Sequence, residues 1–346
     1  MTDNIRPDYK LLANSTDITA LIRERLISLR FTDEAGLQSD ALEISLADDD
    51  PDEPIAMPPT GAELELFLGY DGKADRMGLF VVDEIELEGW PGVMTIRAHA
   101  APFDQSKGGK NTLQSQKTRS WAKDTKLGDL VKKIAKEHRL EPAVSASLAT
   151  IPLPHMDQSD ESDMHFLVRV ARKYDAVVKP ASGKLVIAKR GETKSVSGQQ
   201  LPTITLKPAD VKGWRVTQAK RENSGMVVAY YHQTKKAKRT EVKVGAGEPV
   251  TRLRMHYPTQ AMAKAAAQAE LDKRSRGEVT LSVDVIGRTD LMAEAPLTTA
   301  GFRDGVNGNW IITRVEHELT NDGYVCSIDA ETPNSKETAN IEEITE

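Results

Sequence analysis

Residues 158–191 read QSDESDMHFLVRVARKYDAVVKPASGKLVIAKRG, and the first half of this stretch has the pattern of an amphipathic helix. Its apolar residues recur at three- and four-residue intervals, which places them on one helical face: Met164, Leu167, Val168, Ala171 and Tyr174. Ser159 is the predicted N-cap, because a serine side chain can accept a hydrogen bond from a free N–H of the first turn. Asp160, Glu161 and Asp163 would then lie at the positive end of the helix dipole.

The second half of the stretch predicts a β-hairpin. Residues 176–179 and 184–188 are rich in strand-forming side chains, and the Pro-Ala-Ser-Gly sequence between them is typical of a turn. The whole stretch is therefore a small packing unit in which a helix precedes a hairpin. Nothing in these residue types by themselves indicates a chemical reaction.

The composition is that of a globular chain of about two domains, given its 346 residues. The net charge of −6 gives no general attraction to nucleic acid, and aromatic residues, at 5%, are too few for a platform that stacks bases. The single cysteine, Cys326, excludes an internal disulfide framework and a four-thiolate metal site.

Two further features of the sequence bear on location. No apolar run approaches the roughly 20 residues that span a bilayer. The first residues, MTDNIRPDYK, lack the apolar core of a signal peptide. We therefore expect folding in a reducing cytoplasm and no membrane insertion.

The first and last parts of the chain have the pattern of short β-strands. Alternating apolar residues between turn signals recur through residues 1–103 and again through 201–332, which predicts a small closed barrel or sandwich in each. Between them, an apolar stripe predicts a helix with Thr125 as its N-cap: Leu127, Leu130, Val131, Ile134, Ala135 and His138. We predict an α+β, predominantly β fold, with two similar small β-barrel domains and an intervening α/β module.

The predicted boundaries follow changes in composition. Residues 1–103 form the first β-barrel domain, and residues 104–200 form a basic linker arm followed by the helix-plus-hairpin α/β module. Residues 201–332 form the second β-barrel domain, with an inserted hairpin and alanine-rich helix at about 234–277, the helix opening at Pro258 and Thr259. Residues 333–346 are expected to be an acidic, disordered tail.

An internal repeat relates the two β-rich parts. At a constant offset of 230 residues, Gly78, Phe80, Val81, Val82, Ile85 and Glu86 match Gly308, Trp310, Ile311, Ile312, Val315 and Glu316. The match continues without a gap from Met94, Ile96, Ala98 and Ala100 to Tyr324, Cys326, Ile328 and Ala330. A preserved register matters because a slip of one residue turns every strand side chain to the other face. Chance similarity between two amphipathic hairpins is the alternative.

Four charged segments allow alternative interpretations. Residues 48–54, DDDPDEP, could form a cation site, but a solvated loop is favoured because nothing nearby supplies the rigid loop that calcium needs. The basic residues in 235–239 and 104–139 could bind phosphate, but an exposed hairpin tip and the polar face of a helix are favoured. His155 and His165 flank three carboxylates, those of Asp157, Glu161 and Asp163, which are better explained as helix caps than as metal ligands.

Motifs of catalysis are missing from the sequence. It has no phosphate-binding glycine loop, no zinc-binding helix motif and no nucleophile elbow. We therefore expect no enzyme activity, no cofactor and no metal.

Several of these residues together resemble the phage late control D family. These are the baseplate hub proteins of contractile-tailed phages, and they are related to the hub part of type VI secretion spikes. The positions that carry the resemblance are Gln158, Glu161, Ser162, Asp163, Phe166, Leu167, Arg169, Ala171, Tyr174 and Leu185. Residues 118–121 before 127–129, residues 26–48 and residues 305–319 are similar to the family too. Asp175 departs from the expected glycine after the tyrosine, but aspartate also tolerates the left-handed conformation.

The resemblance implies a structural protein of the virion. In such hubs three chains form a ring, whose six similar barrels match a hexameric tail tube on one side and a trimeric spike on the other. It also implies contacts with the tape-measure protein and other baseplate components, assembly in the cytoplasm of the bacterial host, and no specific nucleic-acid binding. Because the chain shows no long β-helical extension, we expect the spike to be a separate protein. An adaptor that binds cell-wall carbohydrate and a transcriptional regulator are the alternatives.

The charge distribution predicts the character of the channel in such a ring. Residues 31–65 hold eleven Asp and Glu and no Lys or Arg, whereas residues 104–139 and 212–243 are basic. A basic wall would bind the phosphates of passing DNA, so we predict a neutral or acidic inner wall, with the basic segments facing outward or toward protein partners. The alternative is that the acidic run is a peripheral loop.

Overall fold

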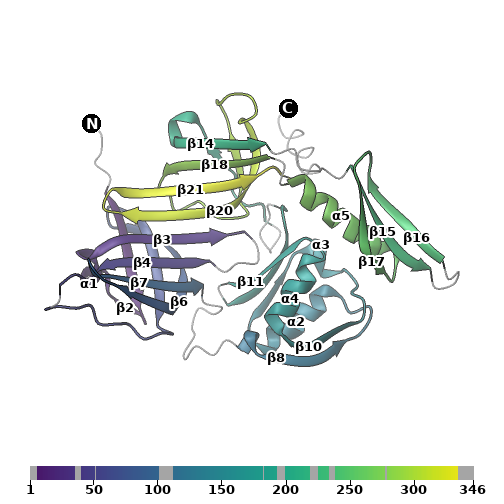
Figure 1. The fold of residues 1–346 in the computed structure, drawn as a ribbon, viewed down its shortest axis with the longest axis horizontal. Coiled ribbons are helices and arrows are strands. Elements are labelled where there is room, and N and C mark those ends of the chain that lie inside the picture. Colours follow the sequence, from purple (N-terminus) through teal and green to yellow (C-terminus); the bar gives the residue numbers. More distant parts are fainter. Residues whose placement is uncertain are drawn as a thin grey trace.

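The computed structural model describes residues 6–35, 40–50, 52–100, 112–181, 183–192, 199–218, 225–233, 238–276 and 279–333. Figure 1 shows a broad β region, an α/β module below it, and a helix with a small sheet at the right. Strands predominate, so the prediction of an α+β, predominantly β fold is confirmed. Residues 104–111 of the predicted linker arm and 334–346 of the predicted tail lie outside the described residues.

The first part of the chain is a succession of strands in which every second side chain is buried. It contains β1 (Pro7–Ala13), β2 (Thr16–Asp17), α1 (Thr19–Arg23), β3 (Leu26–Glu34), β4 (Ala41–Ala47), β5 (Glu63–Tyr70), β6 (Lys73–Glu88) and β7 (Val93–Ala100). In β4, for example, Leu42, Ile44 and Leu46 are buried and the residues between them are partly exposed. This is the alternation that a strand requires when only one of its faces packs on a core.

The module packs two helices against a three-stranded sheet. It contains η1 (Thr112–Gln114), β8 (Gln116–Trp121), α2 (Leu127–Glu137), β9 (Glu141–Val144), α3 (Ala146–Ala149), β10 (Met156–Ser162), α4 (Asp163–Arg172), β11 (Ala176–Ala181) and β12 (Lys184–Lys189). β12 pairs antiparallel with β11 and parallel with β9, so the predicted hairpin is confirmed. The predicted apolar stripe of α2 is buried, and Asp175 has a φ of 51°, the left-handed conformation expected for it.

The last part of the chain returns to the large sheet after an insertion. It contains β13 (Ile204–Leu206), η2 (Pro208–Asp210), β14 (Val211–Gln218), β18 (Val279–Ile286), β19 (Pro296–Thr299), β20 (Gly308–Thr320) and β21 (Gly323–Glu331). The insertion consists of β15 (Met226–Gln233), β16 (Lys238–Gly245), β17 (Val250–Tyr257) and α5 (Gln260–Arg276), and it has its own small core. The predicted hairpin and helix are therefore present, although residues 234–237 at the hairpin tip lie outside the described residues.

One sheet joins the two β-rich parts of the chain. Its strands follow the order β14-β18-β21-β20-β3-β4-β7-β6-β5-β1-β2, with β19 on β20 and β13 on β19. The junction is the antiparallel pairing of β20 with β3, and Figure 1 shows these two strands side by side. A single hydrophobic core contains residues of both parts, including Leu29, Phe31, Val315 and Leu319. The division into two separate barrels stays a prediction.

The internal repeat is visible in the strand order. β3-β4-β7-β6-β5-β1 in the first part corresponds to β14-β18-β21-β20-β19-β13 in the last part, with the strands in the same succession along the chain. The last pair differs in direction, because β1 is antiparallel to β5 whereas β13 is parallel to β19. Each of β6 and β20 has a bulge at the matching place, between Val82 and Glu84 and between Ile312 and Arg314. The prediction of an offset of 230 is therefore confirmed for this strand.

The prediction that the match continues without a gap is wrong for the next strand. Val82 pairs with Ala98, and its counterpart Ile312 pairs with Ala330, so β7 and β21 correspond at an offset of 232. The larger offset arises at the hairpin tip. The β20–β21 ladder continues to Thr320 and Gly323, so this hairpin is longer than that of β6 and β7 although its turn is shorter. Because the offset changes by an even number of residues, corresponding side chains still face the core.

The predicted N-caps need correction. α4 begins at Asp163, and its cap is Ser162, whose Oγ accepts a hydrogen bond from the backbone N–H of His165 at 3.1 Å. Ser159 lies three residues earlier, because β10 stays paired with β8 up to Ser162. Asp160 and Glu161 therefore belong to a strand, and only Asp163 lies in the first turn of the helix.

The cap predicted for α2 is also wrong. Lys126 is its N-cap residue, without a side-chain cap hydrogen bond, and the Thr125 hydroxyl donates instead to the carbonyl oxygen of Ala122. An isolated bridge between Lys126 and Pro152 keeps the chain extended up to the residue before the helix. Tertiary contact has overridden the local capping preference here.

Substituting the two serines separately tests the corrected start of α4. Ser162→Ala should lower the free energy of unfolding by about 1 kcal/mol because it removes a cap, whereas the exposed Ser159→Ala should change it by less than about 0.5 kcal/mol. Leu167→Ala should cost about 2–5 kcal/mol because this side chain is fully buried. Urea unfolding followed by circular dichroism measures all three, and equal losses for both serine variants would contradict the assignment.

Candidate functional site

The residues of the α4 stretch meet in a buried polar network around Asp163. The Asp163 side chain is fully buried at the start of α4. Its Oδ2 accepts a hydrogen bond from Lys117 Nζ at 2.6 Å and lies 2.7 Å from His138 Nε2. Its Oδ1 accepts hydrogen bonds from Arg119 Nη2 at 2.5 Å and Gln158 Nε2 at 2.8 Å. Four different groups thus hold one carboxylate.

The two cations of the network come from one face of β8. Lys117 and Arg119 are two residues apart in this strand, so their side chains point to the same side. Glu137, the last residue of α2, accepts hydrogen bonds from Lys117 Nζ at 3.0 Å and from Arg119 Nη1 at 2.8 Å. Two carboxylates and two cations therefore alternate, which compensates the cost of removing each charge from water.

Burial and hydrogen bonding act in opposite directions on Asp163. Burial by itself raises the pKa of the carboxyl group, but the hydrogen bonds from Lys117, Gln158 and His138 outweigh it and lower the pKa to about 2. The carboxylate is therefore charged throughout the neutral and mildly acidic range. Its charge stabilises the folded chain only as long as these partners stay in place.

Gln158 connects the network to the aromatic core. Its side-chain oxygen accepts hydrogen bonds from Arg119 Nε at 2.9 Å and Trp121 Nε1 at 3.4 Å. Its amide nitrogen donates to Asp163 and to the carbonyl oxygen of Glu161, both at 2.8 Å. The side chain is fully buried, and its hydrogen bonds to Arg119 and Trp121 help to fix β10 against β8, while the other two reach Glu161 of β10 and Asp163 of α4. A glutamine at this position is explained by structure alone.

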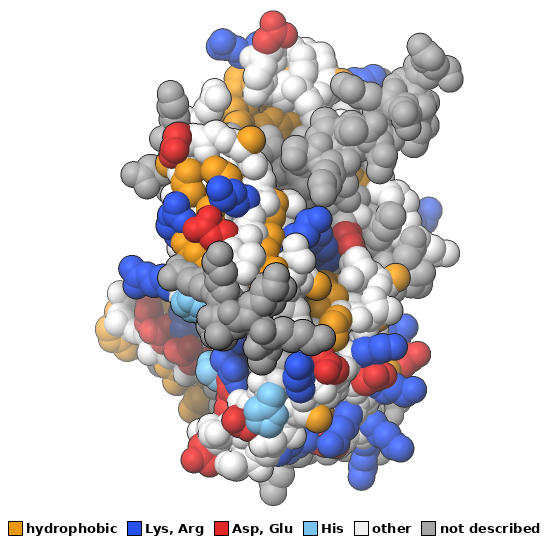
Figure 2. Space-filling view, turned by 90° about the vertical axis from the view of Figure 1, so that its right-hand side faces the viewer, with side chains coloured by type: hydrophobic (Ala, Val, Ile, Leu, Met, Phe, Trp, Pro, Cys, Tyr) orange, Lys and Arg blue, Asp and Glu red, His pale blue; other side chains and the backbone are white. Residues whose placement is uncertain are grey.

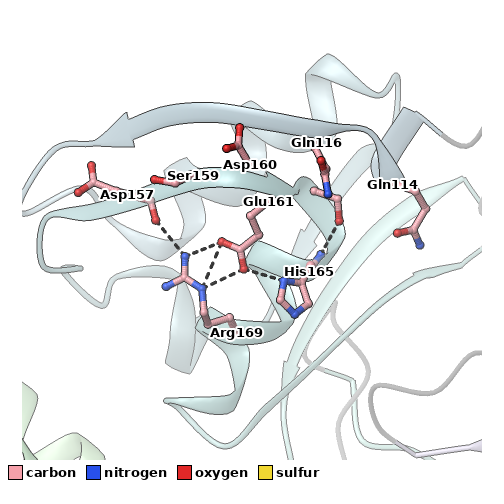
Figure 3. A pocket seen from close by; sticks show the side chains of 9 residues that line it. Gln114, Gln116, Asp157, Ser159, Asp160, Glu161, His165 and Arg169 are labelled. Atoms are coloured by element: carbon pink, nitrogen blue, oxygen red, sulfur yellow. Dashed lines mark hydrogen bonds and ion pairs between the residues drawn. The ribbon is translucent and has the colours of Figure 1, made fainter.

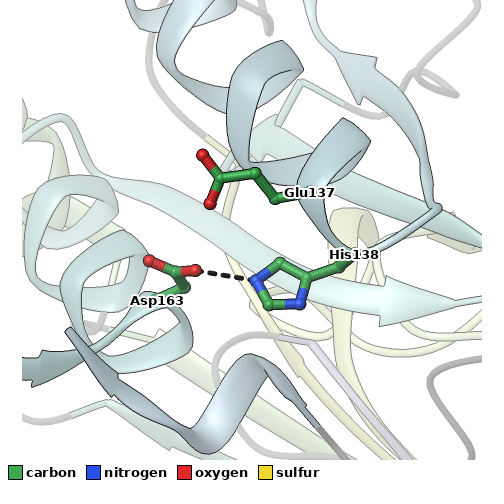
Figure 4. A group of neighbouring side chains, drawn as sticks. All are labelled: Glu137, His138 and Asp163. Carbon is green, nitrogen blue, oxygen red and sulfur yellow. Dashed lines mark hydrogen bonds and ion pairs between the residues drawn. The ribbon is translucent and has the colours of Figure 1, made fainter.

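Three acceptor groups of the network are close enough together to be considered as metal ligands. Ligand atoms of Glu137, His138 and Asp163 lie within 4.8 Å of one another, and Figure 4 shows them converging. The ammonium group of Lys117 already bridges Glu137 and Asp163. A cation therefore occupies the place of a metal ion, and the arrangement favours an ion-pair network.

The outer side of β10 carries a second group of motif residues, beside an open polar hollow of about 720 Å³ (Figure 3). Glu161 Oε2 lies 2.6 Å from Arg169 Nη2, and Glu161 Oε1 lies 2.9 Å from His165 Nδ1. Arg169 also donates to the carbonyl oxygen of Asp157 at 3.0 Å. The hydrogen bond from Arg169 lowers the pKa of Glu161, so this pair fixes the start of α4 to the preceding strand.

The remaining motif residues are part of the hydrophobic core. Phe166 stacks on Trp121 with ring centroids 5.7 Å apart, and Leu167 is fully buried beside it. Tyr174 lies apart from the network, where it lines a hollow of about 330 Å³ together with Tyr257 and Met262 of the inserted unit. Burial raises the pKa of Tyr174 to about 12.

Sequence reasoning named some of these residues and missed others. His155 contacts Asp157 and His165 contacts Glu161, so the two histidines do not share one cluster with Asp163. Lys117 and Glu137 were not singled out, and His138 was predicted only as part of the apolar stripe of α2, because all three come from elements distant in sequence from Asp163. The alternation of Lys117 and Arg119 along a polar strand was the one signal for a charged face.

A second cluster joins the module to the large sheet. Lys179 of β11 places its Nζ 3.1 Å from Asp40 Oδ1 and 3.4 Å from Asp33 Oδ1, and both aspartates lie around the β3–β4 connection. Asp33 Oδ2 accepts a hydrogen bond from the backbone N–H of Ala293 at 2.8 Å. Burial raises the pKa of Asp40 to about 6, although Lys179 opposes this. The first part, the module and the last part of the chain therefore meet at one lysine.

Comparisons with known proteins identify relatives of this chain. A family model described as "Phage tail baseplate hub (GPD)" matches residues 60–323. The chain belongs to the phage tail baseplate hub family. Among curated proteins, it is 36% identical to the "Probable baseplate hub protein" of Escherichia phage 186, over 95% of this chain and 93% of the relative. The protein of the same description from Escherichia phage P2 is 35% identical, over 94% of this chain and 93% of the relative.

Solved structures of tail proteins have a similar fold. The 43 kDa tail protein of prophage MuSo2 from Shewanella oneidensis gives a TM-score of 0.68 at 13% identity, over 94% of this chain and 98% of that chain. A component of the type VI secretion system of Escherichia coli gives a TM-score of 0.57 at 10% identity, over 90% and 74% of the two chains. At these identities the likeness shows the fold alone. Family membership makes the chain a structural component of the tail baseplate of a phage particle.

Replacing Asp163 tests whether the network carries stability. Asp163→Asn should lower the free energy of unfolding at pH 7 by about 3–5 kcal/mol, because Lys117 and Arg119 lose a buried counter-charge. Asp160→Asn in the preceding strand β10 is the matched control, because Asp160 is exposed and its substitution should change stability by less than about 0.5 kcal/mol.

The pH dependence of the same variant has a definite sign. The pKa of Asp163 is about 2 in the folded chain and about 3.9 when unfolded, so its stabilisation is complete above about pH 5 and is lost as the pH falls toward 2. Over that range the difference in the free energy of unfolding between the wild type and Asp163→Asn should decrease by about 2 kcal/mol. Urea unfolding at several pH values measures it, and a constant difference would contradict the role of the charged carboxylate.

Proposed function

We propose that three copies of the chain form a ring that joins the hexameric tail tube to the trimeric spike. The observation that carries this proposal is the repeat of one six-strand order, β3-β4-β7-β6-β5-β1 and β14-β18-β21-β20-β19-β13. Because each chain contains the unit twice, three chains present six similar units. The ring then has threefold symmetry for the spike and nearly sixfold symmetry for the tube.

The junction within one chain supports the ring geometry. β20 and β3 place the two units edge to edge in one continuous sheet, not face to face. Units joined at opposite edges of a sheet can repeat around an axis, and a head-to-tail contact that closes gives a cyclic oligomer. The covalent duplication therefore solves a mismatch between symmetries of three and six.

The proposed partners agree with this position. The tail tube would contact one end of the ring and the spike the other, with the tape-measure protein in the channel and other baseplate components outside. On the face with β15, β16, β17 and α5, positive and negative side chains lie next to each other in the lower half and hydrophobic ones gather in the upper half (Figure 2). Such a mixture suits protein partners better than a phosphate backbone. Assembly would take place in the cytoplasm of the bacterial host.

The polar face of the large sheet is the proposed channel wall, because the hydrophobic core covers the opposite face. This polar face carries Glu34, Glu43, Glu84, Glu86, Glu88, Asp284, Glu316, Glu318 and Asp329 against Arg30, Arg97, Arg215 and Arg314. Arg30 lies 2.8 Å from Glu318 and Arg97 lies 2.8 Å from Glu86, so acidic side chains neutralise these arginines. The excess is acidic, which supports a wall that does not bind phosphate.

Of the acidic residues named for this wall, only Glu34 and Glu43 come from the run at residues 31–65 that suggested it. Of the run at residues 31–65, Asp33 and Asp40 are engaged with Lys179 in the joint, and Asp48 accepts a hydrogen bond from the backbone N–H of Ile55 in its own loop. Most of the acidic wall comes instead from β6 and β20. The wall is therefore still proposed to be acidic, but most of its acidic residues come from other strands than the sequence suggested.

The oligomeric state tests the ring. Light scattering during size-exclusion chromatography should give three times the chain mass of 38.0 kDa, at high concentration or with the spike protein present. A particle of one chain mass under both conditions would contradict the proposal. Electron microscopy of the trimer should then show nearly sixfold symmetry at one end.

Binding of duplex DNA tests the channel wall. The trimer should not retain duplex DNA in a filter assay at about 150 mM salt, because duplex phosphates are held chiefly by cationic side chains. The double variant Asp284→Lys and Asp329→Lys adds cations to the wall and should retain DNA at low salt, with steep loss as salt rises. Salt-resistant retention by the wild-type trimer would contradict an acidic wall.

A further inference from the structure

We infer that β14 of one copy pairs antiparallel with the end of β6 in the next copy, in the register that β3 and β20 use within the chain. The inference rests on the proposed ring and names its interface. It commits to a second copy of this chain as the occupant of both edges.

The two strand edges are open in the described part of the chain. β14 is the last strand of the sheet path and pairs only with β18. Residues Glu84–Glu88 of β6 pair with β7 on one side. On the other side, the partner of β6 ends where Val82 exchanges backbone hydrogen bonds with Gly61 and Ala62. An open strand edge is a template for another strand, so a native protein has reason to cover it.

In the second unit, the strand equivalent to β6 gains a new partner beyond this point. Ile312 exchanges the same pair of backbone hydrogen bonds with Glu294 and Ala295, and Glu294 has a positive φ of 67° where Gly61 has 87°. Immediately beyond, Arg314 to Thr320 of β20 pair with β3. The end of β6 is thus the counterpart of the half of β20 that binds β3. Its natural partner is a counterpart of β3.

β14 is that counterpart of β3. In β3 a bulge lies between Leu26 and Ser28, and in β14 a bulge lies between Val211 and Gly213, each in the ladder to the next strand. Leu29 pairs with Ile44, and Trp214 pairs with the corresponding Val283. The two strands therefore match residue by residue at an offset of 185.

These offsets fix the register between copies. Within the chain, Glu318 pairs with Arg30, His317 with Phe31 and Glu316 with Thr32. Replacing each residue by its counterpart in the other unit gives the pairs between copies. They are Glu88 with Arg215, Leu87 with Val216, Glu86 with Thr217 and Ile85 with Gln218.

The charges on the two edges are complementary in this register. Arg30 Nη2 lies 2.8 Å from Glu318 Oε1 at the junction within the chain. The counterparts, Arg215 and Glu88, are both exposed and have opposite charges. The pairing between copies would therefore reproduce the ion pair that already stabilises the junction.

The apolar side chains on the edges support the same pairing. Leu87 is 53% exposed and Trp214 is 43% exposed, although both lie on the core face of the sheet. Their counterparts His317 and Leu29, which the junction covers, are completely buried. Pairing between copies would cover Leu87 with Val216 and would place Trp214 beside Gly89, where no side chain obstructs it. Charge and burial thus favour a second copy over an unrelated strand.

Disulfide cross-linking tests the register. Glu86→Cys with Thr217→Cys, both in the full chain, places the two Cα atoms about 4.5–5.5 Å apart, within the range of a disulfide. Glu88→Cys with Thr217→Cys is the matched control, because a diagonal pair is about 7–8 Å apart and cannot be bridged without backbone movement. After oxidation, the variant with Glu86→Cys and Thr217→Cys should run as linked dimers and trimers on a non-reducing gel. The control variant should run mainly as single chains.

The outcomes separate this inference from the ring itself. A trimer by light scattering that fails to cross-link at the first pair, or cross-links equally at the control pair, overturns the register and leaves the ring standing. A chain that stays monomeric with the spike protein present overturns both.

A charge exchange gives an independent readout without cysteines. Arg215→Glu should weaken trimer formation by about threefold to tenfold per interface, and Arg215→Glu with Glu88→Arg should restore it. Arg254→Glu, an exposed arginine of β17, is the matched control and should leave the trimer unchanged. Equal effects of Arg215→Glu and Arg254→Glu, with no restoration in the double variant, would overturn the pairing.

Discussion

The antiparallel pairing of β3 with β20 is the contact on which the rest of the structure depends. It brings together residues almost 290 positions apart, such as Arg30 and Glu318, and closes a loop that contains the module and the insertion. The entropy cost of such a long loop grows only slowly with its length, so a well-packed strand pair with a buried face can offset it. Because Phe31 stacks on His317 and packs against Phe80, the pairing merges the two β-rich parts into one core.

The module is held to this sheet by charged groups that are removed from water. Within the module, Asp163 fixes β8, α2, β10 and α4 to one another through four partners. At the joint, Lys179 connects β11 to the β3–β4 connection, and Arg190 donates to the carbonyl oxygen of Ala35 at 3.1 Å. Such ion pairs are weak evidence for net stability, because the pairing must offset the cost of removing each charge from water.

The same physical rule explains the charges on the sheet surface. Acidic residues of β6 and β20 alternate with arginines of β3 and β7, so most cations on this face already have a carboxylate within about 3 Å, as Arg97 has in Glu43 and Glu86. Arg215 on β14 stands at the open edge of this pattern. In the proposed ring, Glu88 of the next copy would continue this pattern.

The sequence by itself determined the elements and the family. Period-two and helical patterns identified most strands, the buried face of α2 and the hairpin at 176–189, and the α4 stretch carried the family resemblance. Local rules failed where a tertiary contact competes with them. Ser162 is the N-cap of α4 in place of Ser159, because pairing with β8 keeps β10 extended. The prediction of a repeat without a gap was wrong because the β20–β21 hairpin is longer at its tip. Only the tertiary structure joined Lys117, His138 and Asp163, or Lys179 and Asp40, because side-chain contacts between distant elements depend on packing and leave no periodic trace in the chain.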